Sequence, residues 1–166
     1  MKIAIQDANF LVDLEMADLL DLYSQLGIET YTSDLVRAEI KLGNHIHALR
    51  VLDSGAIQVH SLSPDELNEV AVLSAEVRGP SFTDCTVLFL AVKHNAMLLS
   101  GDRALRKFAK IKHIEPHGTL WLFDLLIEKG ILNAQDAVPR LQLLLNNSRY
   151  LPRQECETRL SRWRGL

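Results

Sequence analysis

Short apolar runs alternate with longer segments of helical spacing along the whole chain. The short runs are rich in β-type residues and predict strands at residues 2–6, 28–31, 56–62, 96–99 and 112–114. The longer segments predict helices at residues 10–26, 34–42, 45–53, 64–77, 84–94, 103–110, 119–128, 138–145 and 155–163. Strands alternating with helices indicate an α/β protein, and we expect three α/β/α layers around a central parallel sheet of four to five strands.

Local signals mark where several helices begin and end. Asn9 is the expected N-cap of the first helix, and Gly27 is its expected stop. Ser63 and Glu66 have the spacing of a capping box at the start of the helix that follows the third strand. Segment 84–94 is apolar nearly all round, so we expect it to form a helix that is buried on most sides.

The composition is that of one folded domain. The 166 residues are 48% hydrophobic and 23% charged, which excludes a disordered chain and collagen. Two cysteines are too few for a disulfide framework, and they form no Cys-x-x-Cys pair. No apolar run approaches the roughly 18 residues that a membrane span needs, and the start lacks the features of a signal peptide. We therefore expect a cytoplasmic protein with no membrane segment.

The net charge of −3 is unevenly distributed. Residues 1–40 carry a net charge of −6, whereas residues 140–166 carry +4. A general nucleic-acid coat protein would be basic over most of one face. The uneven distribution suits an acidic pocket for cations beside a separate basic patch for an anion, and it equally suits ordinary solvated surface.

Four acidic residues fall where a parallel sheet concentrates its ligands. Asp7 and Asp102 each follow a predicted strand directly, so both should stand at the carboxyl edge of the sheet. Glu39 lies on the helix after the second strand, and Asp84 lies in the first turn of the buried helix, where the helix dipole favours its charge. If these carboxylates converge, their repulsion raises pKa values or is relieved by a cation. Oxygen ligands without cysteine favour Mg²⁺ or Mn²⁺.

A divalent ion in such a cluster orients and activates a water molecule and neutralises charge on a phosphodiester. The predicted reaction is therefore phosphodiester hydrolysis by metal-activated water, with no nucleophilic side chain. Taken singly, each acid is equally well explained as a helix-cap, turn or surface residue. The order and spacing of all four favour the catalytic hypothesis.

The same residues resemble the PIN-domain family of metal-dependent ribonucleases, which includes the VapC-type toxins of toxin–antitoxin pairs. The resemblance covers residues 1–132. Its motifs, in chain order, are Asp7-Ala8-Asn9, Glu39 on the second helix, Thr83-Asp84, Ser100-Gly101-Asp102-Arg103, and Gly118-Thr119-Leu120 with Glu128-Lys129-Gly130-Ile131. The chain departs from the family pattern at Ala8, where Thr or Ser is usual, and at Cys85, where Ala is common.

The resemblance implies a PIN fold over residues 1–132. Residues 133–166 lie beyond it, and we expect them to form a helical extension packed on the same domain, because Leu160 and Trp163 offer apolar area to bury. It implies an endoribonuclease whose cofactor is Mg²⁺ or Mn²⁺. The implied catalytic and metal-binding residues, acting directly or through water and with no general base assigned among them, are Asp7, Glu39, Asp84 and Asp102. The residues expected to contact substrate are Asn9, Ser100, Arg103 and Lys107. Implied partners are an RNA substrate, a cognate antitoxin that blocks the site, and a second copy in a homodimer.

Other features leave alternatives open. A basic helix face formed by Arg103, Arg106, Lys107 and Lys110 is expected either to hold RNA phosphates or simply to be exposed. Ala8 and the long tail favour a second hypothesis, in which the chain is a non-catalytic PIN-like module that binds RNA or protein. A zinc deaminase is excluded because His113-Ile114-Glu115 lacks the paired cysteines of that signature.

Overall fold

The computed structural model describes residues 3–147 and 150–165. Its five strands form one all-parallel sheet in the order β3-β2-β1-β4-β5. The strands are β1 (Ile3–Gln6), β2 (Glu29–Ser33), β3 (Gln58–His60), β4 (Met97–Leu99) and β5 (Pro116–His117). The helices are α1 (Ala8–Met16), α2 (Leu20–Ser24), α3 (Asp34–Leu42), α4 (Ile46–Asp53), α5 (Pro64–Glu76), α6 (Phe82–His94), α7 (Arg103–Ile111), α8 (Thr119–Glu128), α9 (Ala134–Asn146) and α10 (Arg153–Trp163). The predicted three-layer α/β/α class is confirmed.

The order of the strands reverses direction between β1 and β4. The chain passes from β1 through β2 to β3 at one side of the sheet, and then crosses over to β4 and β5 on the other side of β1. Because parallel crossovers are right-handed, the helices that follow β1 and β2 cover one face, and those around β4 cover the other. A reversal of this kind opens a crevice at the carboxyl ends of β1 and β4, where ligands of α/β proteins bind.

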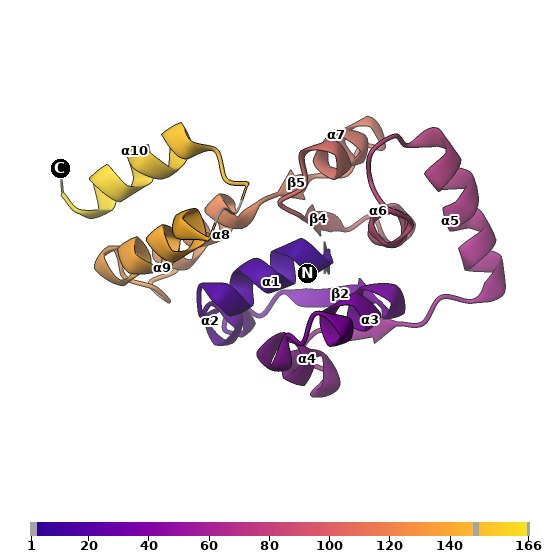
Figure 1. The fold of residues 1–166 in the computed structure, drawn as a ribbon, viewed down its shortest axis with the longest axis horizontal. Coiled ribbons are helices and arrows are strands. Elements are labelled where there is room, and N and C mark those ends of the chain that lie inside the picture. The colour runs from indigo at the N-terminus through magenta and orange to yellow at the C-terminus, as the bar shows by residue number, and fades with distance from the viewer. Residues whose placement is uncertain (1–2, 148–149, 166) are drawn as a thin grey trace.

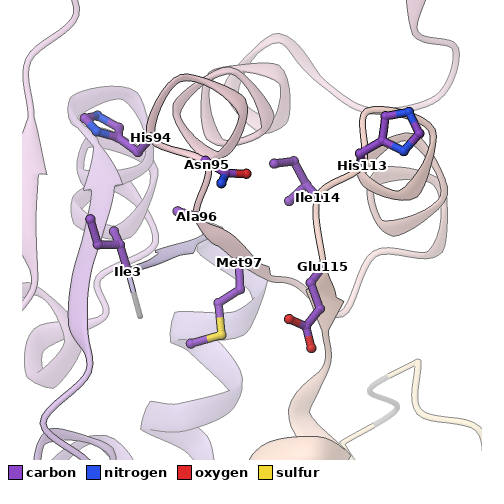
Figure 2. A pocket seen from close by; sticks show the side chains of 8 residues that line it. All are labelled: Ile3, His94, Asn95, Ala96, Met97, His113, Ile114 and Glu115. Atoms are coloured by element: carbon purple, nitrogen blue, oxygen red, sulfur yellow. The ribbon is translucent and has the colours of Figure 1, made fainter. Parts of the chain in front are cut away.

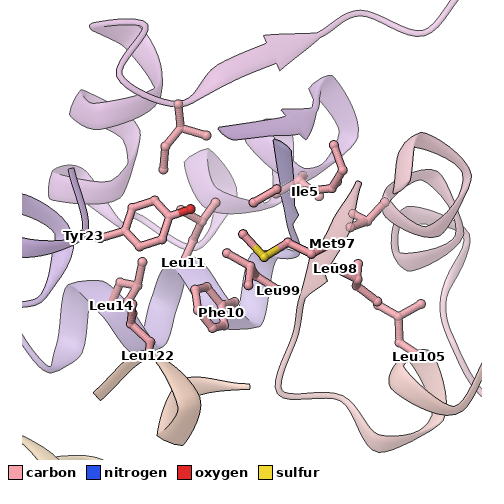
Figure 3. Close-up of a cluster of buried hydrophobic side chains, with 14 of the residues drawn as sticks. Ile5, Phe10, Leu11, Leu14, Tyr23, Met97, Leu98, Leu99, Leu105 and Leu122 are labelled. Atoms are coloured by element: carbon pink, nitrogen blue, oxygen red, sulfur yellow. The ribbon is translucent and has the colours of Figure 1, made fainter. Parts of the chain in front are cut away.

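The core lies on both sides of the two central strands. Helix α6 is buried from Cys85 to Ala91, which confirms the expectation that this helix is enclosed on most sides. Figure 3 shows Phe10 of α1 beside Leu99 of β4, and Leu105 of α7 beside Leu98. Burial of these side chains fixes the starts of α1, α6 and α7 relative to the sheet.

The predicted first helix is two helices in the structure. Asp7, not Asn9, is the N-cap of α1, because the Asp7 side chain accepts the Phe10 N–H. Helix α1 ends in a Schellman turn, in which the Asp18 and Leu19 N–H groups bond back to Glu15 and Leu14 while Asp18 takes a φ of 53°. The prediction of one helix is wrong here because apolar periodicity continues through a break that tertiary packing stabilises.

The predicted fifth strand at residues 112–114 is also wrong. That segment is the C-terminal turn of α7, in which Ile114 N–H bonds to the Ala109 carbonyl and His113 takes a φ of 59°. The strand β5 follows it at Pro116–His117 and pairs with Leu98 and Leu99 of β4. Ile114 is buried, as a residue of a central strand would be, but the turn after α7 places it in the core.

The C-terminal helices pack on α8. Figure 1 shows α8, α9 and α10 together at one end of the molecule, with α5 at the other. Trp163 of α10 is buried with its ring 5.6 Å from that of Phe123 in α8. Arg159 of α10 donates two hydrogen bonds to Asp124 of α8, at 2.6 and 2.9 Å. Within the described ranges, each helix is too short or too polar to cross a membrane.

Candidate functional site

The carboxyl ends of β1 and β4 bring Asp7 and Ser100 side by side. Gln6 pairs with Leu99 in the sheet, so the next residues along each strand, Asp7 and Ser100, lie level with each other. The Asp7 N–H bonds to the Leu99 carbonyl at 3.2 Å, which extends the ladder by one residue. Asp7 therefore stands at the point where the strand order reverses, as predicted for a residue at the functional edge.

The Asp7 carboxyl is fully buried. One oxygen, Oδ1, accepts the Phe10 N–H at 2.7 Å, and the other, Oδ2, accepts the Ser100 hydroxyl. The pKa of Asp7 is raised to about 7, chiefly by burial and in smaller part by the negative charges of Asp84 and Asp13, while the two hydrogen bonds act to lower it. The carboxyl therefore changes charge near neutral pH, and a cation beside it would favour its ionised form.

Ser100 connects Asp7 to Asp102. Its hydroxyl donates to Asp7 and accepts the Asp102 N–H at 3.0 Å. Asp102 in turn caps α7, because its Oδ1 accepts the Leu105 N–H at 2.6 Å. The hydroxyl thus holds the start of α7 against the end of β1, and it orients two of the predicted catalytic acids.

Asp84 reaches the same edge from α6. It is the N3 residue of a capping box with Ser81, in which its Oδ2 accepts the Ser81 N–H at 2.9 Å and the Ser81 hydroxyl accepts the Asp84 N–H at 3.1 Å. A hydrogen bond of 2.7 Å between the hydroxyls of Thr86 and Ser33 ties the start of α6 to the start of α3. Asp84 is close enough to Asp7 for its charge to raise the Asp7 pKa.

Three helix N-termini therefore carry the three aspartates. Asp7, Asp84 and Asp102 each use one carboxylate oxygen on a backbone N–H at the start of α1, α6 and α7. The positive ends of the helix dipoles reduce the mutual repulsion of the carboxylates. Helix capping thus accounts for the local position of each acid, and the fold places the three helix starts at the carboxyl edge of the sheet.

Glu39 is not joined to these acids. It lies on the exposed face of α3, and within the described part of the chain no hydrogen bond or ion pair connects its carboxylate to Asp7, Asp84 or Asp102. The acid that follows β2 directly is Asp34, in the first turn of α3. Its Oδ1 is buried and has no hydrogen-bond partner among the described residues, which is unusual for a carboxylate oxygen.

Asp13 is a buried acid that the sequence analysis did not identify. Only 4% of its surface is exposed, and its Oδ2 accepts the Thr119 hydroxyl at 2.8 Å. Its charge contributes to the raised pKa of Asp7. The sequence did contain a signal for this residue. Asp13 lies between Leu11 and Leu14 on the apolar face of an amphipathic helix, where an apolar residue is normally found.

A cavity of about 360 Å³, the site cavity, opens beside Asp13 and Asp102, whereas Asp7, Glu39 and Asp84 do not line it. Its lining includes Asn9, Asp13, Asp102 and Arg103, together with Tyr150 from the loop before α10. The predicted substrate residues Asn9 and Arg103 therefore face one space. Ser100 is buried and bonded to Asp7, so its role in the structure is to orient that acid.

Lys107 faces a neighbouring cavity of about 310 Å³, the basic cavity, which is lined by Arg103, Arg106, Lys107, Lys110 and Pro116. Among the described residues, none of these four cations forms an ion pair with an acid. Because Arg103 lines both cavities, the basic cavity adjoins the site cavity.

A further cavity of about 400 Å³ lies at the opposite edge of the sheet. Figure 2 shows it between Ile3 and Met97, near the amino ends of β1 and β4, with His94, His113 and Glu115 at its rim. None of the predicted site residues lines it. Its size therefore does not identify it as the catalytic site.

The aspartates supply oxygen ligands, which are the type of ligand that a hard divalent cation prefers. The donors are carboxylate and hydroxyl oxygens, and the buried Asp34 Oδ1 still lacks a partner among the described residues. Within residues 3–147 and 150–165, no three acid, histidine or cysteine side chains are grouped closely enough to hold one metal ion together. Mg²⁺ usually takes only one or two carboxylates and completes its shell with water and substrate phosphate, so a site of this kind would need only one or two of the aspartates.

Comparisons with known proteins agree with this fold. A family model described as a PIN domain (DUF3368) matches residues 3–164. Among solved structures, the chain is similar to the crystal structure of PAE2754 from Pyrobaculum aerophilum, with a TM-score of 0.59 and 20% sequence identity. That similarity covers 76% of this chain and 98% of the other. No curated protein matches the sequence.

Proposed function

Because the chain belongs to the PIN domain family, whose members are in general nucleases, we propose that it is a metal-dependent endoribonuclease. The observation that carries the proposal is the buried Asp7, whose pKa is raised to about 7, first by burial and further by the charges of Asp84 and Asp13. Such an arrangement costs folding free energy at neutral pH, since burial disfavours the charged form of the carboxyl by more than its two hydrogen bonds favour it. A cation that binds at this edge offsets the cost, and this gives the burial a functional reason.

In the proposed reaction, Asp7, Glu39, Asp84 and Asp102 hold Mg²⁺ or Mn²⁺ directly or through water. When bound, the ion supplies an activated water and offsets the charge that develops on the phosphodiester. The protein's own contribution is orientation. Ser100 and the Phe10 N–H fix both oxygens of Asp7, and the Leu105 N–H fixes one oxygen of Asp102.

Cleavage of single-stranded RNA in the presence of Mn²⁺ tests the proposal. We expect the purified protein to cut an end-labelled RNA, and Asp7→Asn to reduce the rate by about 100-fold or more, because a ligand that orients the reacting groups is lost. Asp21→Asn, the same change at an exposed position on α2, should leave the rate unchanged. Cleavage that persists with Asp7→Asn would identify a contaminating nuclease.

The competing hypothesis is a non-catalytic module that binds RNA or protein. Its support is Ala8, where the resemblance leads us to expect a hydroxyl, and the fact that three aspartates already act as helix-capping residues. If neither the wild-type protein nor Asp7→Asn cleaves RNA, while RNA still binds, this second function is the correct one.

The finer assignment, as the toxin of a toxin–antitoxin pair, is supported by the motif resemblance. On this proposal an antitoxin protein blocks the site, and the chain forms a homodimer. A short reading frame beside the gene, whose product abolishes the RNA cleavage when the two proteins are mixed, is the expected result. Cleavage that is unaffected by the neighbouring gene product would remove the toxin assignment and leave the nuclease assignment intact.

A further inference from the structure

The C-terminal loop forms a third cavity beside the acidic edge. This aromatic cavity, of about 200 Å³, lies between the Gly118–Trp121 segment and the loop at Tyr150, Leu151 and Pro152. Gly101, Tyr150 and Leu151 line both the aromatic cavity and the site cavity. The two cavities therefore adjoin, and a ligand whose reacting phosphate lies near Asp102 has a neighbouring space within reach.

The wall of the aromatic cavity is a stacked pair of rings. His117 and Trp121 lie with their ring centroids 4.0 Å apart and their planes 15° from parallel. The His117 Nε2 is 2.8 Å from a carboxylate oxygen of Glu115, which fixes the imidazole in this orientation. Tyr150, whose side chain is fully exposed, also lines this cavity. Preoriented aromatic rings at the edge of a groove are the usual platform for an unstacked nucleobase.

Positive charge lies at the junction of the cavities. Arg106 lines both the aromatic and the basic cavities, and a Cβ added at Gly118 would come within 3.0 Å of the Arg106 Nη1, so the guanidinium lies against the Gly118 backbone. The other arginine of the aromatic cavity, Arg159, is paired with Asp124 and Glu155. Arg106 and Arg103 therefore supply the charge that a phosphate backbone needs, between the stacked rings and the acids.

We propose that the aromatic cavity is a subsite for one unpaired base of a single-stranded RNA, completed by the C-terminal loop. The strand's phosphates follow Arg103 and Arg106, and the base adjacent to the scissile phosphate enters between Tyr150 and the His117–Trp121 pair. A duplex keeps its bases stacked inside, so it cannot fill this cavity without base extrusion. The inference rests on the proposed function for the nature of the ligand, and it adds the residues that contact one unpaired base.

Binding measured without metal tests this inference separately from cleavage. The probe is a fluorescently labelled eight-nucleotide RNA of mixed sequence, in EDTA, with the full-length protein. We expect Tyr150→Ala and His117→Ala each to weaken binding by about 5- to 100-fold, the usual loss for one base stack. His47→Ala, an exposed histidine on α4, is the matched control and should bind as the wild type does. Tyr150 is fully exposed, so its replacement should not disturb folding.

A second readout reports the stacking itself. The chain has two tryptophans, and Trp163 is buried against Phe123, so quenching of tryptophan fluorescence on RNA addition should come from Trp121. The same strand annealed to its complement should bind more weakly and quench less. Equal affinity of wild type, Tyr150→Ala and His117→Ala for the single strand would overturn the inference, as would equal binding of the duplex. Loss of cleavage with intact binding and quenching would instead overturn the proposed function alone.

Discussion

At the scale of single residues, the most informative group is the Asp7 carboxyl. It is the N-cap of α1 and accepts hydrogen bonds from Phe10 and Ser100, yet burial still raises its pKa to about 7. A residue needed only as a cap would be equally well served by a neutral side chain such as asparagine. Retaining a buried acid therefore lowers stability at neutral pH in exchange for a charge at the edge of the sheet.

The stability of the metal-free protein should depend on pH through Asp7. The ordinary pKa of an aspartate is 3.8, and the pKa of Asp7 in the folded protein is about 7. Between these values the folded state binds a proton that the unfolded state has lost, so stability is greatest below about pH 4, falls as the pH rises to 7, and then levels off. From pH 5 to pH 8 we expect a loss of about 2–3 kcal/mol from this group.

Urea unfolding in EDTA at several pH values measures this effect. Asp7→Asn keeps an oxygen for the Phe10 N–H but removes the ionisation, so its stability should change less with pH and should exceed that of the wild type at pH 8. Asp21→Asn, at an exposed site, is the control. Parallel pH profiles for wild type and Asp7→Asn would show that Asp7 titrates normally.

A pair of substitutions tests which acid of α3, Glu39 or Asp34, takes part in the site. Glu39 is exposed, whereas Asp34 has a buried oxygen without a partner in the described ranges. If the resemblance assigns the site correctly, Glu39→Gln should lower RNA cleavage by about 10-fold or more, and Asp34→Asn should have the smaller effect. Initial cleavage rates at saturating Mn²⁺ measure both. The reverse order would assign the role to Asp34.

At the scale of elements, α7 combines a functional start with a basic face. Its first turn is fixed by Asp102 and Ser100, and its exposed side carries Arg103, Lys107 and Lys110. Residues three and four apart lie on one side of a helix, so these cations present a row of positive charge beside the site cavity. The helix is thereby suited to hold a phosphate backbone next to the acids.

Removing two cations from α7 should weaken RNA binding in a salt-dependent way. The double substitution Arg103→Ala with Lys107→Ala should reduce the slope of log affinity against log salt by about 1.4, because each lost contact to a single strand accounts for about 0.7. Lys41→Ala with Arg50→Ala removes the same charge from exposed positions on α3 and α4. Filter binding from 50 to 300 mM salt compares the two. Equal slopes would dismiss the basic face as an RNA contact.

At the scale of the whole molecule, the C-terminal helices join the body through buried contacts. Arg140 of α9 donates to the Ala17 carbonyl at 2.8 Å, which satisfies the C-terminus of α1. Trp163 and Leu160 of α10 are buried, and Arg159 is held by Asp124 of α8. The family match extends to residue 164 and so includes these helices. Tyr150 and Leu151, which precede α10, line the site cavity.

Trp163 should be important for the stability of the molecule as a whole. Trp163→Ala removes a large buried side chain from α10, and we expect a loss of about 3–5 kcal/mol in the free energy of unfolding. Arg164→Ala, an exposed neighbour, should change it by less than about 0.5 kcal/mol. Chemical denaturation followed by circular dichroism measures both. A variant whose main transition is unchanged would show that α10 is an independent appendage.

The sequence alone predicted those features of the structure that depend on local interactions. The capping box at Ser63 and Glu66 forms as predicted, since the two partners are three residues apart. Ser33 and Ser81 cap α3 and α6 through equally local hydrogen bonds. Alternating strands and helices likewise predicted a parallel sheet, because only βα units with short connections fit that pattern. The positions of Asp7 and Asp102 at strand ends followed from the same rule.

Only the tertiary structure decided what depends on contacts between distant segments. The break after α1 occurs where Arg140, more than a hundred residues away, bonds to the freed carbonyls of Ala17 and Asp18. The burial of Asp13 depends on Thr119, and the aromatic cavity depends on a loop that follows α9. Propensity and capping act over a few residues, whereas desolvation and long-range hydrogen bonds arise only when the chain is folded. For this reason the sequence determined which residues can carry charge at the edge of the sheet, and the fold decided which of them are buried, paired and brought together.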